Sequence, residues 1–258
     1  GTGMSKYWIR PEDGARGTLL LISPEHALRG GPEQTKLVPA VDENADVLLE
    51  YTAARMLRRT LMDVGAGRRI TAVSGYRPHQ EQVKIWEDTM RKEGEKFTRT
   101  YVAKPGHSEH ESGLAVDLAE QREEIDFIRP EFPRSGICRR FRDMAPYRGF
   151  VERYLSGKEN VTGIGAEPWH FRYVGYPHSV IMTRRGLVLE EYLQFLKEET
   201  SPEHPYIYRS GNARIDICYL PLDQWAGKEL EWPDNLPALI SGTNEGGIVW
   251  TRWRERYA

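Results

Sequence analysis

Cysteine is scarce in this sequence, and its scarcity limits how a metal ion could be held. Only two cysteines, Cys138 and Cys218, occur among the 258 residues. They allow at most one disulfide and cannot form a cysteine-based zinc site. Any metal bound by this chain must therefore be held by histidine, aspartate or glutamate.

Long hydrophobic runs are also missing. The longest uninterrupted aliphatic run covers residues 19–22, whereas a membrane-spanning helix needs about 18–20 apolar residues. The first residues, GTGMSKYW, contain no apolar segment like that of a signal peptide. We therefore expect no membrane segment and a cytoplasmic location, with the cell envelope or the extracellular space as the alternative for a chain trimmed from a secreted precursor.

The sequence has no marked excess of charge of either sign. Its 36 lysine and arginine residues face 38 aspartate and glutamate residues, for a net charge of −2. Because a nucleic-acid-binding protein usually has a strong basic excess, we expect no nucleic acid partner. Apolar residues make up 39% of the chain, and 258 residues suffice for a sizeable core in one or two domains.

The spacing of the apolar residues indicates an α+β organisation. Apolar side chains recur on one helical face between residues 45 and 64, and Pro78 suits the first position of a second helix. Charged residues at 91–99 predict a solvated turn after it. We expect further helices at 138–145 and 186–197, and short strands at 18–22, 70–73, 213–220 and 247–253.

Two segments alternate in the manner of strands with one buried face. Residues 113–119 place Asp117 on a face of small residues, where another group can approach closely. Residues 169–173 place His170 and Arg172 on the face opposite three aromatic side chains. Each strand therefore carries on one face at least one polar side chain that could contribute to a site.

His110, Asp117 and His170 could together form a metal site. Six residues, including Gly113, separate His110 from Asp117, so a loop can turn back and bring both side chains to one point. His170 supplies a third ligand if its strand pairs beside that of Asp117. Two neutral imidazoles and one carboxylate leave a zinc ion with an open position for water, which is typical of hydrolytic sites.

Glu167 lies three residues before His170 and could act on the water bound to such a zinc ion. Its role would be that of general base and then of acid to the leaving amine. Any one of these residues alone would more often be an ordinary surface, core or salt-bridged residue. Their conjunction supports the metal-site hypothesis.

That conjunction resembles the zinc D,D-peptidases of the VanY, VanX and VanXY type. Residues 108–117, SEHESGLAVD, match the family signature S-x-H-x-x-G-x-A-x-D, and residues 167–175, EPWHFRYVG, match its E-P-W-H-x-R-Y-V-G segment. Residues 74–77, SGYR, with Gln82, resemble a third element, and residues 149–154, GFVERY, a fourth. The resemblance covers roughly residues 17–200, with the motifs in family order.

The resemblance implies a fold, a reaction and a role for each residue. The implied fold is an antiparallel sheet with flanking helices, with residues 17–200 as the catalytic domain and residues 201–258 as a small β-rich C-terminal extension packed on it. The implied reaction is zinc-dependent removal of D-alanine from D-alanyl-D-alanine or from peptidoglycan precursors, as in vancomycin resistance. The implied roles are one zinc ion per chain on His110, Asp117 and His170, Glu167 as base, Arg77 as oxyanion stabiliser, and Gln82 and Ser108 as ligands of the substrate carboxylate.

Two other functions remain as alternatives. The same scaffold could carry a peptidoglycan endopeptidase that cuts an interior bond such as L-alanyl-D-glutamate. It could also be a Hedgehog-like zinc module that binds a partner without hydrolysis, although a purely structural zinc site does not need a base such as Glu167. The sequence departs from the family where Pro78 and His79 follow the SGYR element and where the chain extends beyond residue 200, and both departures bear on specificity.

Overall fold

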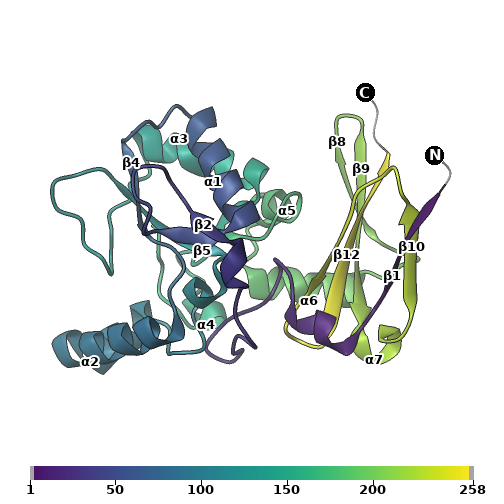
Figure 1. Cartoon of the computed structure of the whole chain (residues 1–258), viewed down its shortest axis with the longest axis horizontal. Helices are drawn as coiled ribbons and strands as arrows, with labels where there is room; N and C mark the ends of the chain where they lie inside the picture. The colour runs from purple at the N-terminus through teal and green to yellow at the C-terminus, as the bar shows by residue number, and fades with distance from the viewer. Residues whose placement is uncertain (1–2, 256–258) are drawn as a thin grey trace. The chain divides into compact units, whose positions relative to one another are not determined.

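The computed structural model of the chain describes residues 3–255. The chain divides into two compact units (Figure 1). Residues 22–188 form the larger unit, and the segments up to Leu21 and from Leu189 onward together form the smaller unit. The predicted domains, a catalytic domain at residues 17–200 and an extension at residues 201–258, were defined by their expected roles. That assignment of roles stays a prediction.

The larger unit contains a four-stranded antiparallel sheet, a two-stranded sheet and the helices around them. Its helices and strands are β2 (Leu37–Pro39), β3 (Leu48–Glu50), α1 (Tyr51–Asp63), β4 (Ile70–Ser74), α2 (His79–Tyr101), β5 (Ala115–Glu120), α3 (Gly136–Met144), β6 (Phe150–Glu152), α4 (Glu159–Thr162), β7 (His170–Tyr173) and α5 (His178–Arg185), with the 3-10 turns η2 (Gln34–Lys36), η3 (Glu109–Ser112) and η4 (Ala145–Arg148).

The four-stranded sheet has the strand order β4-β5-β7-β6, and all its pairings are antiparallel. The predicted α+β class with an antiparallel sheet and flanking helices is therefore confirmed. Helices α1 and α3 pack against each other in this unit (Figure 1). Their apolar side chains share one core with those of the sheet, including Leu57 of α1, Phe141 of α3, Val116 of β5 and Phe171 of β7.

The alternation of β5 and β7 separates this apolar core from a polar face. Val116 and Phe171 belong to the core, whereas their chain neighbours Asp117 and His170 project to the opposite face. Both polar side chains are nevertheless buried, with 5% and 3% of their surface exposed. Because burial of a charged or polar group is costly unless it is paired, this face needs polar partners.

Two of the expected helical boundaries are wrong. The helix expected within 45–64 begins only at Tyr51, because residues 48–50 form β3 and pair with β2. The turn expected at 91–99 is absent, since α2 continues to Tyr101 across a kink at Gly94, where φ is 85°. Glycine adopts this left-handed conformation without strain, so the helix can change direction and continue.

The smaller unit is mainly β-structure. Its elements are β1 (Met4–Trp8), η1 (Pro11–Ala15), α6 (Leu189–Glu199), β8 (Tyr206–Ser210), β9 (Ala213–Pro221), α7 (Leu222–Trp225), β10 (Glu229–Pro233), β11 (Ala238–Gly242) and β12 (Gly247–Glu255). Four strands form an antiparallel sheet in the order β11-β12-β9-β8, and β1 pairs with β10. The predicted strands at 213–220 and 247–253 are confirmed, whereas the pairing of β1 with β10 was not foreseen.

The apolar run at 18–22 is buried but is not the strand that its composition predicts. Leu19 and Leu21 are each 1% exposed, yet the segment pairs with no strand in the described residues. The backbone N–H of Leu19 donates to Ser241 Oγ, and that of Leu21 donates to the carbonyl of Thr243. A side chain of β11 and the backbone of the loop that follows β11 thus supply these hydrogen bonds, and the run is buried without a ladder.

Among residues 3–255, no helix combines the length and the apolar character needed to cross a membrane. Cys138 and Cys218 are both buried and both free.

Candidate metal centre

The register of β5 and β7 brings two of the predicted ligands together. Asp117 lies directly opposite His170 in the antiparallel pair, so the expected pairing of their strands is confirmed. His110 comes from η3, which ends at Gly113 in the left-handed conformation, with φ at 77°. This turn leads the chain straight into β5, and His110 returns to the side of Asp117 as the spacing of the sequence predicts.

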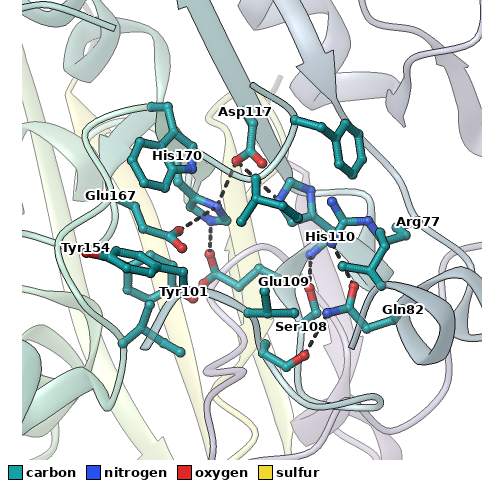
Figure 2. Close-up of a pocket in the computed structure, with 17 residues that line it drawn as sticks. Arg77, Gln82, Tyr101, Ser108, Glu109, His110, Asp117, Tyr154, Glu167 and His170 are labelled. Carbon is teal, nitrogen blue, oxygen red and sulfur yellow. Dashed lines mark hydrogen bonds and ion pairs between the residues drawn. The ribbon is translucent and has the colours of Figure 1, made fainter. Parts of the chain in front are cut away.

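The three side chains converge on one point (Figure 2). His110 Nε2 lies 3.2 Å from Asp117 Oδ1, and His170 Nδ1 lies 3.1 Å from the same oxygen. One potential ligand atom from each residue lies within 4.8 Å of the other two, and all three residues are buried. The cluster could therefore hold a metal ion.

The outward-facing ring nitrogens support this interpretation. His110 Nδ1 lies 2.8 Å from the carbonyl oxygen of Gly75, and His170 Nε2 lies 3.0 Å from Glu109 Oε1. An imidazole that donates one N–H to an oxygen presents its other nitrogen as a lone pair, and metal-binding histidines usually have such partners. The donor set of two imidazole nitrogens and one carboxylate oxygen thus fits a metal ion.

Burial and neighbouring charges act on the two histidines in opposite ways. Burial lowers the pKa of His110 below its ordinary value. Burial alone would also lower the pKa of His170, but hydrogen bonds to Asp117 and Glu109 raise it to about 10. The pKa of Asp117 is lowered despite its burial, because both histidines lie beside it. Without a metal ion, His170 therefore carries the cationic charge at neutral pH.

We expect metal binding to release a proton from His170. At pH 6 the metal-free His170 is protonated because its pKa is about 10, whereas burial lowers the pKa of His110. A metal ion must displace the proton from His170, so its affinity should rise with pH. Calorimetric titrations in buffers of different ionisation enthalpy should show that about one proton is released. A Glu167→Gln variant removes the carboxyl group of Glu167, which is the other nearby group that could release a proton. A heat of binding that is independent of the buffer would contradict this expectation.

Glu167 lies beside the cluster at the mouth of β7. Its Oε2 is 3.5 Å from His170 Nδ1, and the residue is 5% exposed. Its backbone N–H donates to the carbonyl of Tyr154, and its own carbonyl accepts from the N–H of His170. The backbone from which the Glu167 side chain extends is therefore held in place. Burial raises the pKa of Glu167 well above its ordinary value, and only part of that effect is offset by His170. A raised pKa makes this carboxylate a stronger proton acceptor than an ordinary glutamate.

Arg77 extends a buried cation toward the same pocket. Its guanidinium donates to Gln82 Oε1 at 2.8 Å and to Ser74 Oγ at 2.9 Å. Its backbone N–H donates to the carbonyl of His110. Burial lowers the pKa of Arg77, but an arginine keeps its charge at any pH near neutrality. The cation is therefore held by side chains of β4 and α2, and its backbone is bonded to the turn that carries His110.

The two remaining predicted residues take part in the internal hydrogen bonds of the pocket. Gln82 Nε2 donates to the carbonyl of Ala103 at 2.7 Å, while its oxygen accepts from Arg77. Ser108 Oγ accepts from the N–H of His110 at 3.2 Å. Each keeps a hydrogen for a further bond, namely the second amide N–H of Gln82 and the hydroxyl hydrogen of Ser108.

All seven predicted site residues line a single pocket. The remaining lining is largely aromatic and aliphatic, and includes Tyr101, Phe127, Tyr154 and Trp169. Polar groups of opposite charge thus converge in a pocket with an otherwise mostly apolar wall. This composition is typical of a small-molecule site.

A buried ion-pair cluster behind His170 was not predicted from the sequence. Glu109 accepts from Arg153 Nε at 2.9 Å and from Arg172 Nη1 at 2.6 Å, and all three side chains are fully buried. Burial alone would raise the pKa of Glu109, but the two arginines hold it well below its ordinary value. A signal did exist, because Glu109 directly precedes His110 and Arg172 shares the strand face of His170.

Replacing Gly75 by alanine should disturb the site through the backbone. A Cβ at this position would lie 2.3 Å from the carbonyl oxygen of Leu48, so the chain must shift. The Gly75 carbonyl that orients His110 would move with it. We expect a loss of stability of about 1–3 kcal/mol and metal binding weaker by about 10–100-fold.

Urea unfolding and chelator competition measure the two effects of Gly75→Ala. Gly31→Ala is the matched control, because a Cβ there meets no atom within 4 Å and its φ is not in the left-handed region. Equal metal affinity in the two variants would refute the proposed role of the Gly75 carbonyl.

Comparison with known proteins places this site in a family. The model of the family described as VanY, D-alanyl-D-alanine carboxypeptidase, matches residues 48–176. The chain belongs to the VanY family. The matched segment contains the three candidate metal ligands, Glu167 and Arg77.

Individual relatives are similar over most of their length. The bifunctional D-Ala-D-Ala dipeptidase and carboxypeptidase VanXYC of Enterococcus gallinarum is 39% identical over 182 residues, which are 70% of this chain and 96% of that protein. The structure of the vancomycin resistance D,D-dipeptidase VanXYg, in complex with a D-Ala-D-Ala phosphinate analogue, matches with a TM-score of 0.93 and 42% identity over 98% of this chain and all of that chain.

A third match is more distant and contains a metal. A mutant of the D,D-pentapeptidase VanY from a VanB-type resistance cassette, in complex with Zn(II), matches with a TM-score of 0.56 and 27% identity. The match covers 68% of this chain and 98% of that chain. The similarity to VanXYg thus extends over both units, whereas that to this VanY covers about two thirds of the chain.

Proposed function

We propose that this protein is a zinc-dependent D,D-carboxypeptidase and D,D-dipeptidase that hydrolyses the D-Ala-D-Ala bond of free dipeptide and of peptidoglycan precursors. The observation that carries the proposal is the convergence of His110, Asp117 and His170 in a buried pocket that also contains Glu167. The complex of the similar VanXYg with a D-Ala-D-Ala analogue supports the choice of substrate.

One zinc ion per chain would be held by His110 Nε2, Asp117 Oδ1 and His170 Nδ1. These atoms face one another, while the other ring nitrogens are engaged by Gly75 and Glu109. When bound, zinc supplies a Lewis acid that polarises the scissile carbonyl and makes water more acidic. The similarity to a VanY in complex with Zn(II) supports zinc as the metal.

Glu167 is the proposed general base. It would take a proton from the attacking water and then deliver that proton to the nitrogen of the leaving D-alanine, which completes the cleavage without net change in the carboxyl group. Its pKa, raised by burial, suits a group that must hold the proton between these two steps. Its fixed position 3.5 Å from His170 Nδ1 keeps it beside the reacting atoms.

Arg77 would stabilise the negative charge that develops on the carbonyl oxygen. Its cation is oriented by Ser74 and Gln82 before the substrate arrives, so little reorganisation is needed during the reaction. Gln82 and Ser108 would bind the terminal carboxylate of the substrate with their remaining donors. A small peptide that ends in D-Ala-D-Ala offers both the carbonyl and the carboxylate that this arrangement requires.

The test of the proposal is product analysis by mass spectrometry. The purified protein is incubated with D-alanyl-D-alanine, with muramyl pentapeptide and with intact peptidoglycan, each with and without a chelator. We expect D-alanine from the dipeptide and the pentapeptide, and none after chelation. Fragments from an interior bond of peptidoglycan would indicate an endopeptidase instead, and zinc binding without any product would indicate a binding module.

Hydrolysis of free dipeptide would place the protein in the cytoplasm, because the dipeptide is used there to build wall precursors. The removal of D-Ala-D-Ala termini would contribute to glycopeptide resistance, since the similar VanXYg is described as a vancomycin resistance D,D-dipeptidase. Fractionation of cells that express the full-length protein would test the location.

A further inference from the structure

We infer that Glu109 is a positioning residue for the metal centre, which sets the orientation and the tautomer of His170. It accepts a hydrogen bond from His170 Nε2 and thereby directs His170 Nδ1 toward Asp117. The inference rests on the proposed function, because it assumes that a metal ion occupies this cluster. It concerns a residue that lies outside the ligand set and the general base.

The two oxygens of Glu109 have different partners. Oε1 lies 3.0 Å from His170 Nε2, whereas Oε2 accepts from Arg153 Nε at 2.9 Å and from Arg172 Nη1 at 2.6 Å. The ion pairs therefore use the oxygen that the histidine does not contact. This division leaves Oε1 free to receive the imidazole N–H in a fixed direction (Figure 2).

The arginines hold Glu109 from separate parts of the sheet. Arg172 lies in β7, two residues after His170, and Arg153 directly follows β6. Both side chains are fully buried, as is that of Glu109. Because breaking a buried ion pair leaves an uncompensated charge, the carboxylate cannot turn away without a large cost. A rigid acceptor thus lies behind a proposed ligand.

Tyr154 lies between the same cluster and the ring of His170. The Arg153 guanidinium lies 4.9 Å from the centre of the Tyr154 ring, and the Tyr154 and His170 ring centres are 4.9 Å apart. The orientation of the imidazole is thus set by packing on one side and by a hydrogen bond on its edge.

The chemical reason for a carboxylate at this place lies in the two tautomers of histidine. A neutral imidazole carries its proton on either nitrogen, and only the tautomer with the proton on Nε2 presents a lone pair on Nδ1. A carboxylate is acceptor-only when ionised, so it selects that tautomer and makes the ligand more basic. The turn η3 therefore contributes twice to the site, because His110 is a proposed ligand and its neighbour Glu109 orients the other histidine, His170.

The experiment compares zinc affinity in the wild-type protein and in Glu109 variants. Zinc-loaded full-length protein is titrated with a chromogenic chelator for wild type, Glu109→Gln and Glu109→Asp. Glutamine keeps the size but loses the charge, and aspartate keeps the charge but is too short to reach His170 Nε2 without movement. We expect the zinc Kd to rise by about 10–100-fold in both variants.

Glu152→Gln is the matched control. Glu152 also pairs with two arginines, Arg134 and Arg142, and its side chain is only 12% exposed, but it contacts none of the proposed ligands. We expect its zinc Kd to stay within about twofold of the wild type. Proton NMR of the zinc-loaded proteins gives a second readout, since the Nε2–H of His170 should be shifted downfield by its hydrogen bond to a carboxylate in the wild type and in the control, and less so in Glu109→Gln.

The outcomes separate this inference from the proposed function. A wild-type protein that binds no zinc overturns both. A wild type that binds zinc, with a Glu109 variant that folds and binds it within about twofold as tightly, overturns the inference alone. Should Glu109→Gln fail to fold, Glu109→Asp decides the question, because it retains the buried charge between Arg153 and Arg172.

Discussion

Replacing Glu167 by glutamine is expected to lower kcat for D-alanyl-D-alanine by about 10²–10⁴-fold, the range for loss of a general base. Glutamine occupies nearly the same volume but cannot accept and return a proton. The three proposed metal ligands are unchanged, and the backbone hydrogen bonds of residue 167 to Tyr154 and His170 do not involve its side chain. The variant should therefore keep its zinc and its fold while it loses turnover.

Two measurements on the same Glu167→Gln sample decide this prediction. Zinc content by mass spectrometry of the metal is the internal control and should remain near one per chain. Steady-state release of D-alanine gives kcat and KM, and the loss should be in kcat because the substrate carboxylate is bound elsewhere. Near-normal turnover at full zinc content would show that another group acts as the base.

Replacing Asp117 by alanine should abolish both metal binding and activity. Asp117 supplies the only negative charge in the proposed ligand set, and its Oδ1 lies between the two imidazoles, 3.2 Å from His110 Nε2 and 3.1 Å from His170 Nδ1. Its removal leaves two neutral ligands, which are too few for a stable zinc site. We expect the dialysed variant to hold almost no zinc, with activity at the level of the chelated wild type.

Asp216→Ala is the control for Asp117→Ala. Asp216 is also a buried aspartate on a central strand, and it pairs with Arg214 and Arg254 in the smaller unit. Its loss should lower stability without changing zinc content in the folded protein. If Asp117→Ala remains fully metallated and active, the ligand assignment is wrong, whatever its effect on stability.

The predicted site could be deduced because its parts are close in sequence or follow a simple period. A single turn at Gly113 separates His110 from Asp117, and strand alternation fixes the side of the sheet to which Asp117 and His170 project. Glu167 is only three residues from His170. Local geometry therefore nearly determines each of these relations.

Glu109 was missed for the opposite reason. Its partners Arg153 and Arg172 are 44 and 63 residues away in the chain, so no short spacing links them to Glu109. The sequence shows a glutamate beside a ligand, which in most proteins would be exposed. Only the register of β7 beside β5 and β6 encloses that carboxylate between two arginines.

The errors in the predicted fold have a similar cause. The charge of residues 91–99 indicates solvent, but exposure alone does not end a helix, and α2 continues beyond its kink at Gly94. The apolar run at 18–22 indicates burial correctly, yet its backbone bonds to a side chain of β11 and to the loop after β11 instead of forming a strand ladder. In both cases the sequence pattern predicted whether the segment is exposed or buried, but it did not predict which groups its backbone would hydrogen-bond.

By itself, the sequence determined which chemistry this protein can perform. Two cysteines excluded thiolate ligands, and the signature around His110, Asp117, Glu167 and His170 limited the site to a nitrogen and oxygen centre with a nearby base. The tertiary structure decided how those groups are held. It placed Asp117 opposite His170, pointed the second nitrogen of each histidine at an oxygen, and buried Glu109 between two arginines. The physical reason is that ligand types follow from composition and short spacing, whereas the orientation and charge of a ligand depend on buried neighbours that only strand pairing brings within hydrogen-bond distance.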